Sequence, residues 1–182
     1  MGQYYAINGS FLLEPALGVQ RYATEILKQM NKMAPAYKEC LRLVLVLPET
    51  PRLEEIRREF SNIEVRCAGK SRRIKVWEQV CFARFLRKEK AKGICLCNTV
   101  PLFSKGGLVC VHDIVFKTHP EYFKEPGAWH EILYRKWMYT HAFHKADIIV
   151  TVSETSKKEI LEQYRAVSYT HLRAHETLMN LV

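Results

Sequence analysis

Two proton-exchanging side chains, His112 and Asp113, come directly after an unbroken apolar run at residues 108–111. A short continuous apolar run is typical of a strand that is buried on both faces of a parallel sheet. In open α/β sheets, ligands bind in the crevice at the carboxyl ends of the strands. We therefore take His112 and Asp113 as candidate catalytic residues. The alternative interpretation is a buried structural histidine followed by a turn or helix cap.

Further polar residues are expected at the same edge of the sheet. Asn8, Asn98 and Ser153 each follow a predicted strand, and Lys117 lies in the loop beyond His112. The carboxyl ends of parallel strands meet at one edge, so we treat these four residues as strand-end candidates. Ser153 is more readily explained as a helix cap, because serine at that position accepts a hydrogen bond from the first helical turn.

Gly18 opens a predicted amphipathic helix, in which apolar residues recur every three or four positions. A helix N-terminus offers free N–H groups and a positive dipole end to a phosphate. Arg21, one turn further, is either a phosphate contact or a structural residue. The chain has no G-x-G-x-x-G after its first strand and no P-loop, H-E-x-x-H, G-x-S-x-G or C-x-x-C motif. These absences disfavour dinucleotide-binding, P-loop, hydrolase and zinc-site classes.

Predicted strands alternate with predicted helices along the chain. The strands are expected at residues 4–7, 41–47, 63–67, 94–97, 108–111 and 147–152. The helices are expected from Gly18, at 52–60, through the basic segment 70–92 up to Gly93, at 127–145 and after Ser153, with loops at 8–15 and 116–126. This alternation predicts an α/β fold with a Rossmann-like, doubly wound parallel sheet.

The composition suits one sizeable domain, with 182 residues, 48% hydrophobic and 26% charged. No apolar segment reaches the span of a bilayer, and the first residues lack the pattern of a signal peptide, so we expect a cytoplasmic protein. The six cysteines are expected to be reduced and mostly buried. Cys95 and Cys97 are the one weak hint of a metal pair, and we expect no metal.

Four stretches occur in one order along the chain. They are Gly18-Val-Gln-Arg-Tyr-Ala-Thr-Glu25-Ile-Leu, Trp77-Glu78-Gln79, Val111-His112-Asp113-Ile with Pro120-Glu121-Tyr122-Phe123, and Ala146-Asp147-Ile-Ile-Val-Thr-Val-Ser153-Glu-Thr-Ser-Lys. Together they resemble the N-terminal lobe of family-four (group 1) glycosyltransferases, which have the GT-B fold. The resemblance is to bacterial enzymes that build capsular polysaccharide, O-antigen or exopolysaccharide, and it covers nearly all of residues 4–164.

The resemblance implies a retaining transferase that moves a sugar from a nucleotide-sugar donor to a sugar or lipid-linked acceptor, without a metal or other cofactor. In such enzymes the N-terminal lobe mainly holds the acceptor, and a second lobe holds most of the donor. Gly18 would face the donor diphosphate, and His112 would hydrogen-bond the donor sugar or stabilise developing charge. Asp113 would orient His112 or the following loop. Asn8, Asn98, Lys117 and Ser153 would then be acceptor-side candidates.

The chain departs from this family because it lacks the second lobe with its Glu-x7-Glu motif, so we expect the 182-residue chain alone to be inactive. Two other classes remain open. One is a non-catalytic nucleotide- or sugar-phosphate-binding Rossmann module. The other is a nucleic-acid-binding domain, although we expect no nucleic-acid partner.

The net charge of +9 is concentrated in residues 70–92, which hold nine basic and two acidic residues and so contribute +7. The predicted helix there has a wide apolar face that includes Trp77, Val80, Phe82 and Phe85. Its basic side could be a solvated face, a nucleic-acid surface or a docking surface for anionic membrane at the inner face of the plasma membrane. We favour the membrane, because acceptors of this family are lipid-linked; the opposing expectation is that the aromatic residues are core. The membrane-facing candidates are Arg72, Arg73, Lys75, Arg84, Arg87 and Lys88.

The end of the chain differs in character from the rest. Residues 167–177 break the helix periodicity, lack strand alternation and are expected to fit no unit of the sheet. They resemble the translated read-through of a sequencing-library adapter. We therefore expect one domain at residues 1–166, incomplete at its C-terminal end, followed by a non-native tail at residues 167–182.

Overall fold

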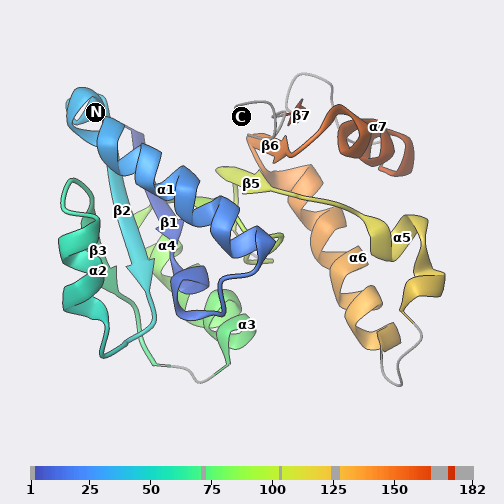
Figure 1. Ribbon diagram of the computed structural model, residues 1–182, viewed down its shortest axis with the longest axis horizontal. Helices are drawn as coiled ribbons and strands as arrows, with labels where there is room; N and C mark the ends of the chain where they lie inside the picture. Colours follow the sequence, from blue (N-terminus) through green and yellow to red (C-terminus); the bar gives the residue numbers. More distant parts are fainter. Residues whose placement is uncertain (1–2, 71–72, 103, 124–127, 165–171, 175–182) are drawn as a thin grey trace.

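A parallel sheet forms the centre of the computed structural model, which describes residues 3–70, 73–102, 104–123, 128–164 and 172–174. Its strands are β1 (Gln3–Asn8), β2 (Leu41–Leu47), β3 (Glu64–Cys67), β4 (Lys92–Cys95), β5 (Leu108–Cys110), β6 (Ile148–Thr151) and β7 (Leu172–Ala174). They lie in the order β3-β2-β1-β4-β5-β6-β7, and every neighbouring pair is parallel (Figure 1). The predicted Rossmann-like, doubly wound sheet is confirmed. Its order reverses between β1 and β4, which is where such sheets bind ligands.

Helices cover both faces of the sheet. The α-helices are α1 (Gly18–Tyr37), α2 (Leu53–Glu59), α3 (Ile74–Trp77), α4 (Ala83–Glu89), α5 (Val115–Thr118), α6 (Ala128–Lys145) and α7 (Glu154–Gln163). Leu27 of α1 and Ile56 of α2 pack into the core on one face, and Trp77, Met138 and Ile160 pack into the core on the other. Figure 1 accordingly shows α1 across the front of β1 and β2, with α4 behind them. None of the helices described is long and apolar enough to cross a bilayer.

The basic segment forms one helical stretch, but a π-helical turn, η2 (Glu78–Phe82), joins α3 to α4. A π turn inserts an extra residue and rotates the faces of the helix on either side of it. Trp77 and Phe82, five residues apart, are therefore both fully buried, and their rings stack at 5.7 Å. Val80, which belongs to the apolar face predicted from the sequence, is separated from these buried residues, because the same turn leaves its side chain 58% exposed.

The end of this helix also differs from the prediction. Gly93 was expected to terminate it, but the left-handed residue is Lys90 (φ 53°), and the helix ends at Glu89. Gly93 instead lies buried in β4, where it faces Gly107 at the start of β5. A side chain at Gly107 would collide with the backbone of Gly93, so the close approach of the two chain segments explains the glycine at position 107.

Short helical turns replace two of the predicted loops. A 3-10 turn, η1 (Ser10–Leu13), follows β1, and α5 and a second 3-10 turn, η3 (Pro120–Tyr122), follow β5. The expectation that no part of residues 167–177 joins the sheet is wrong for β7, which pairs with β6. An open strand edge offers unpaired N–H and C=O groups to any segment nearby, and this pairing does not require an apolar pattern. The rest of the predicted tail lies outside the described residues.

Candidate functional site

A hollow of about 400 Å³ lies at the carboxyl edge of the sheet. Its lining contains three of the residues predicted from the sequence, namely Gly18, Asn98 and the membrane-facing candidate Lys75. The other lining residues are Glu14, Leu17, Val19, Gln20, Cys97, Thr99, Glu131, Tyr134, Arg135 and Met138. The lining residues come from the loop after β1, the start of α1, the loop after β4, α3 and α6. The hollow therefore lies where the switch-point rule places a ligand.

Gly18 is the first residue of α1 and is exposed to solvent. A Cβ built on it would meet no atom within 4 Å, and its φ does not lie in the left-handed region, so neither packing nor backbone geometry requires glycine here. The residue before it, Leu17, provides no side-chain cap. The first-turn amides of a helix have no intrahelical acceptor, so this end of α1 can donate hydrogen bonds from its backbone amides to an anion.

Asn98 connects the hollow to His112. It has a left-handed backbone (φ 56°), and its Oδ1 accepts a 2.7 Å hydrogen bond from the backbone N–H of His112. Asparagine adopts this conformation more readily than most residues. Asn98 lines the hollow, and His112 lies directly behind it, outside the lining itself.

The His112 ring is buried, with 9% exposure, and its Nε2 lies 3.0 Å from the Leu96 carbonyl oxygen. A carbonyl oxygen can only accept, so Nε2 carries the hydrogen and donates it. Burial lowers the pKa of His112, with partial opposition from Leu96 and Asp113, which favours the neutral ring. In that neutral tautomer Nδ1 is a hydrogen-bond acceptor.

Tyr22 of α1 holds the other side of the His112 ring. The two rings meet edge to face, with centroids 4.9 Å apart and planes at 84°. The Tyr22 hydroxyl also bonds the Cys110 thiol, and burial is the main cause that raises the pKa of Tyr22 to about 12. The Cys110 sulfur lies 3.6 Å from His112 Nε2. The imidazole is thus fixed by β5 and α1 together.

Asp113 and Ser153 both act on the backbone that follows them. Asp113 Oδ1 accepts from the N–H of Val115 at 3.2 Å, which fixes the loop into α5. This contact agrees with the expected loop-orienting role. Ser153 caps α7, because its Oγ accepts from the N–H of Ser156 at 3.1 Å. The helix-cap interpretation of Ser153 is confirmed.

Asn8 is hydrogen-bonded to Glu78 of the π turn, which is not among the site residues predicted from the sequence. Glu78 Oε1 accepts hydrogen bonds from Asn8 Nδ2 at 2.7 Å, Thr99 Oγ1 at 2.8 Å and Ser10 Oγ at 3.3 Å. Asn8 is the last residue of β1, Ser10 follows β1 and Thr99 follows β4, so the donors come from the two strands on either side of the switch point. One carboxylate oxygen therefore joins both strand-end loops to the helix behind them.

The Glu78 carboxyl group is 4% exposed, and burial raises its pKa in spite of the three donors. Its second oxygen, Oε2, is buried and has no hydrogen-bond partner among the described residues. A buried polar atom without a partner is costly, and such atoms concentrate at functional sites. In the sequence, the sign that could have indicated Glu78 is an acidic residue beside Trp77 on the apolar side of a basic helix.

The structure does not bring Arg21 or Lys117 into the hollow. Arg21 Nε donates to the Ala16 carbonyl at 3.0 Å, which supports the structural interpretation of that residue. Lys117 Nζ donates to the Gln163 carbonyl at 2.6 Å and lies 3.8 Å from the Tyr164 ring centroid. Lys117 therefore ties α5 to the end of α7.

The membrane-facing candidates separate into two groups. Lys75 points to α6, where it pairs with Glu131 at 2.7 Å and lines the hollow. Glu131 also pairs with Arg135 at 3.0 Å. Arg73, Arg84, Arg87 and Lys88 are exposed, and Arg72 lies outside the described residues. The idea that Trp77 and Phe82 lean on a membrane is wrong, because both are fully buried.

The possible metal ligands among the described residues include the predicted pair Cys95 and Cys97. Within the described ranges, no group of three or more histidine, cysteine, aspartate or glutamate residues is placed to share an ion. Burial raises the pKa of both Cys95 and Cys97, which favours their neutral thiols over metal-binding thiolates.

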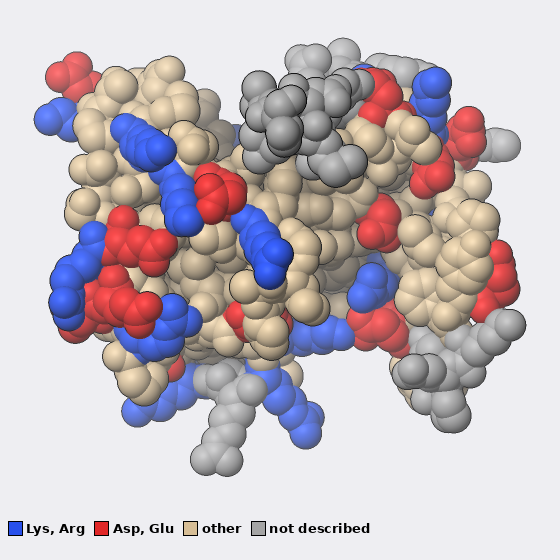
Figure 2. All heavy atoms as spheres, in the orientation of Figure 1, with Lys and Arg blue, Asp and Glu red and all other residues tan. Residues whose placement is uncertain are grey.

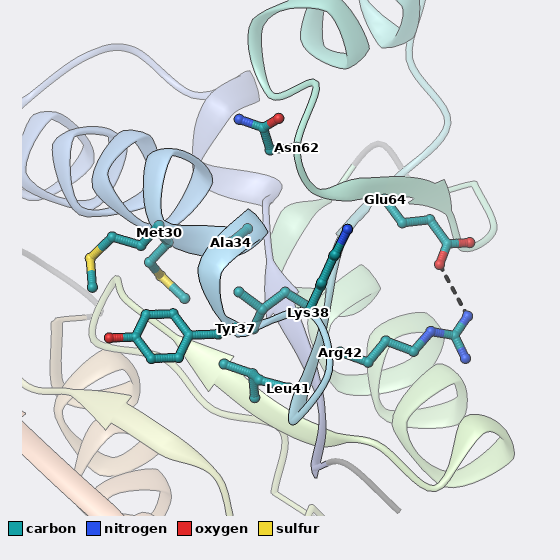
Figure 3. A pocket seen from close by; sticks show the side chains of 10 residues that line it. Met30, Ala34, Tyr37, Lys38, Leu41, Arg42, Asn62 and Glu64 are labelled. Carbon is teal, nitrogen blue, oxygen red and sulfur yellow. Dashed lines mark hydrogen bonds and ion pairs between the residues drawn. The ribbon is translucent and has the colours of Figure 1, made fainter.

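A second hollow, of about 470 Å³, lies at the opposite edge of the sheet, where α1 ends and β2 begins. Figure 3 shows Met30, Tyr37 and Leu41 around it, with the Arg42–Glu64 ion pair at one side. The Arg42 guanidinium and the Glu64 carboxylate lie 3.0 Å apart, so each charge already has an opposite charge beside it. The hollow is larger and more apolar than the one at the carboxyl edge, but none of the residues predicted from the sequence lines it.

Comparison with known proteins adds no assignment to this geometry. No protein-family model and no curated protein matches the chain.

Proposed function

We propose that this chain is the N-terminal, acceptor-side lobe of a two-lobed retaining glycosyltransferase of the GT-B class. The enzyme would transfer a sugar from a nucleotide-sugar donor to an acceptor in cell-surface polysaccharide synthesis. One observation carries the proposal: the open helix start at Gly18 and Asn98, which is hydrogen-bonded to the backbone of His112, line a single hollow at the switch point. The sequence resemblance assigns roles to Gly18 and His112. Gly18 lines the hollow, and His112 is joined to it through the hydrogen bond that its backbone N–H donates to Asn98.

The donor diphosphate would lie against the start of α1. The Gly18 surroundings are open, so phosphate oxygens can approach the backbone amides without meeting a side chain. The positive end of the helix dipole favours negative charge there. Lys75 and Arg135 on the lining would add positive charge, although Glu131 already pairs with both.

His112 would act as a neutral imidazole. With Nε2–H donated to Leu96, the Nδ1 lone pair is available to accept a sugar hydroxyl or to stabilise positive charge that develops near the reacting carbon. Asn98 is a positioning residue in this scheme, because it holds the backbone of His112 and lines the hollow. A protonated ring would lose the Nδ1 acceptor, so ligand binding that depends on it should weaken at acidic pH.

Titration of the isotopically labelled chain with uridine diphosphate, guanosine diphosphate and inorganic pyrophosphate tests the site by NMR. We expect the amide resonances of Gly18, Val19 and Asn98 to shift, and Gly18→Ala to weaken binding while leaving the folded spectrum intact. Leu17→Ala, also on the lining, is the matched control that keeps the backbone open. Shifts confined to other regions with all three ligands would contradict the assignment.

A transfer assay tests the division between two lobes. We expect no turnover of nucleotide-sugars by this chain alone, because the donor-side glutamates of the family would belong to the second lobe. Turnover by the chain alone would contradict the two-lobe assignment. Sequencing the source locus across the codons for residues 165–182 provides the complementary test, since the proposal expects a reading frame that continues into a second α/β lobe.

A further inference from the structure

The last two turns of α1 carry an apolar stripe that the sheet does not cover completely. Its residues recur every three or four positions and so share one face of the helix; they are Met30, Met33, Ala34 and Tyr37. A 20-residue helix is about 30 Å long and a seven-residue strand about 23 Å, so β2 is too short to cover all of α1. Met33 and Tyr37 are accordingly 53% and 46% exposed. Figure 2 shows charged side chains in a row along the outer side of α1, so the helix separates charged from apolar side chains.

This stripe forms one wall of the hollow of about 470 Å³ at the amino edge of the sheet. The facing wall contains Leu41 and Leu43, which are alternate residues of β2, and Asn62 and Glu64 beside them. Asn62 ties this wall to α1, because its backbone N–H donates to Asn31 Oδ1 at 3.0 Å and its Nδ2 donates to the Asn31 carbonyl at 3.2 Å. The hollow is therefore preformed, and its volume lies in the usual range of small-molecule pockets, roughly 300–1,000 Å³.

One side of the hollow is polar and carries a positive charge. Figure 3 shows Lys38, Arg42 and Glu64 on this side, opposite the apolar side chains of α1. The Glu64 carboxylate lies between two guanidinium groups, at 3.0 Å from Arg42 and 2.6 Å from Arg66. Among the residues that the structure describes, no carboxylate pairs with Lys38. A ligand that matches this hollow is therefore apolar along its length and negatively charged at one end.

We propose that the hollow at the amino edge binds a small amphipathic carboxylate, with its aliphatic chain against the α1 stripe and its carboxylate beside Lys38. Burial of the chain supplies most of the binding free energy, and the ammonium group fixes the orientation. A nucleotide or a sugar phosphate would use the cation and leave Met33 and Tyr37 without a role. A second copy of the chain would bring the same cations together in a two-fold contact. The proposal does not rest on the assignment of sugar transfer.

Methionine-methyl NMR of the full chain tests the binding, with decanoate as the probe. Met30 and Met33 line this hollow, whereas Met138 lines the hollow at the carboxyl edge. Below the micelle concentration of decanoate, we expect the Met30 and Met33 methyl resonances to shift until they saturate and the Met138 resonance to stay unchanged. Unchanged resonances of Met30 and Met33, or an equal shift of Met138, would overturn the proposal.

A neutral analogue tests the role of the carboxylate. In Lys38→Gln, the affinity for decanoate relative to decan-1-ol should fall about threefold, because an exposed ion pair contributes little more than that. Lys32→Gln is the matched control, since it removes the same charge from an exposed position of α1 that does not line the hollow. The same relative affinity in the wild-type chain and in Lys38→Gln would overturn the assignment of the carboxylate to Lys38.

A double variant tests the role of the apolar stripe. Met33→Ser/Tyr37→Ser should bind decanoate roughly tenfold more weakly, because less apolar surface is available, and Met30 remains as the reporter. The matched control is Leu133→Ser/Trp137→Ser, which changes two exposed apolar residues four positions apart on α6. Equal losses in the two variants would overturn the proposal. A dimer in light scattering that dissociates in Met33→Ser/Tyr37→Ser would instead assign the stripe to self-association and also overturn the proposal.

Discussion

The two edges of the sheet carry hollows of similar size but of different chemical character. At the amino edge, Met30, Tyr37 and Leu41 line an apolar hollow of about 470 Å³, and its Arg42–Glu64 pair is exposed and mutually satisfied. At the carboxyl edge, a hollow of about 400 Å³ lies beside groups that burial has perturbed. Size therefore does not distinguish the two hollows. The carboxyl-edge hollow is the candidate site because buried titratable groups and an open helix start lie beside it.

Glycine substitutions should show the largest difference in stability between a position that the fold requires and a position in the candidate site. Gly107→Ala should destabilise the protein by about 3 kcal/mol or more, because φ is +89° and a Cβ would collide with the backbone of Gly93. Gly18→Ala should change stability by no more than about 0.5 kcal/mol, since its Cβ meets no atom. Urea unfolding measures both. Similar costs at the two positions would mean that Gly18 is also required by the fold.

The buried carboxylate of Glu78 should be the next most sensitive point. Glu78→Ala removes the shared acceptor of Asn8, Ser10 and Thr99 and should destabilise the protein by about 3 kcal/mol. Glu78→Gln keeps one acceptor oxygen and should cost less, about 1 kcal/mol. The unfolding midpoint in urea measures these effects. Exposed Glu25→Ala on α1 is the control, and a comparable loss there would contradict a special role for Glu78.

A smaller effect is expected at Asn98. Asn98→Ala removes the 2.7 Å bond to the His112 N–H and forces alanine into a left-handed conformation, for a cost of about 2 kcal/mol. Asn98→Gly restores the backbone freedom but not the acceptor, and Asn98→Asp restores the acceptor. Urea unfolding of the three variants separates the two contributions. If the glycine variant recovers full stability, the bond to His112 contributes nothing measurable.

The pH dependence of stability should show two opposite slopes. The folded state lowers the pKa of His112, so the unfolded state binds more protons, and stability is lost as pH falls below about 6.5. The folded state raises the pKa of Glu78, so stability is lost as pH rises above about 4.5 through its raised pKa. Thermal unfolding measured from pH 4 to pH 8 gives the stability at each pH. The first slope should be absent in His112→Asn and the second in Glu78→Gln. Unchanged profiles would contradict these pKa directions.

Local sequence determined most of the framework of this protein. The alternation of apolar runs with amphipathic helices predicted the doubly wound sheet, because burial on both faces demands continuous apolar strands. Ser153 was predicted as a cap because its partner, Ser156, lies only one turn away. Gly18 and Asn98 were predicted at one edge, because the carboxyl ends of parallel strands meet there.

Tertiary structure alone decided which side chains meet and which are exposed. Glu78 contacts Asn8 across 70 positions of sequence, and no local pattern carries such a pairing. The π turn exposed Val80 while the Trp77 and Phe82 side chains of the same predicted apolar face are buried, and Glu131 on another helix pairs with Lys75. Periodicity fixes the face of a regular element, whereas long-range contacts and a shift in helical register depend on how separate elements pack.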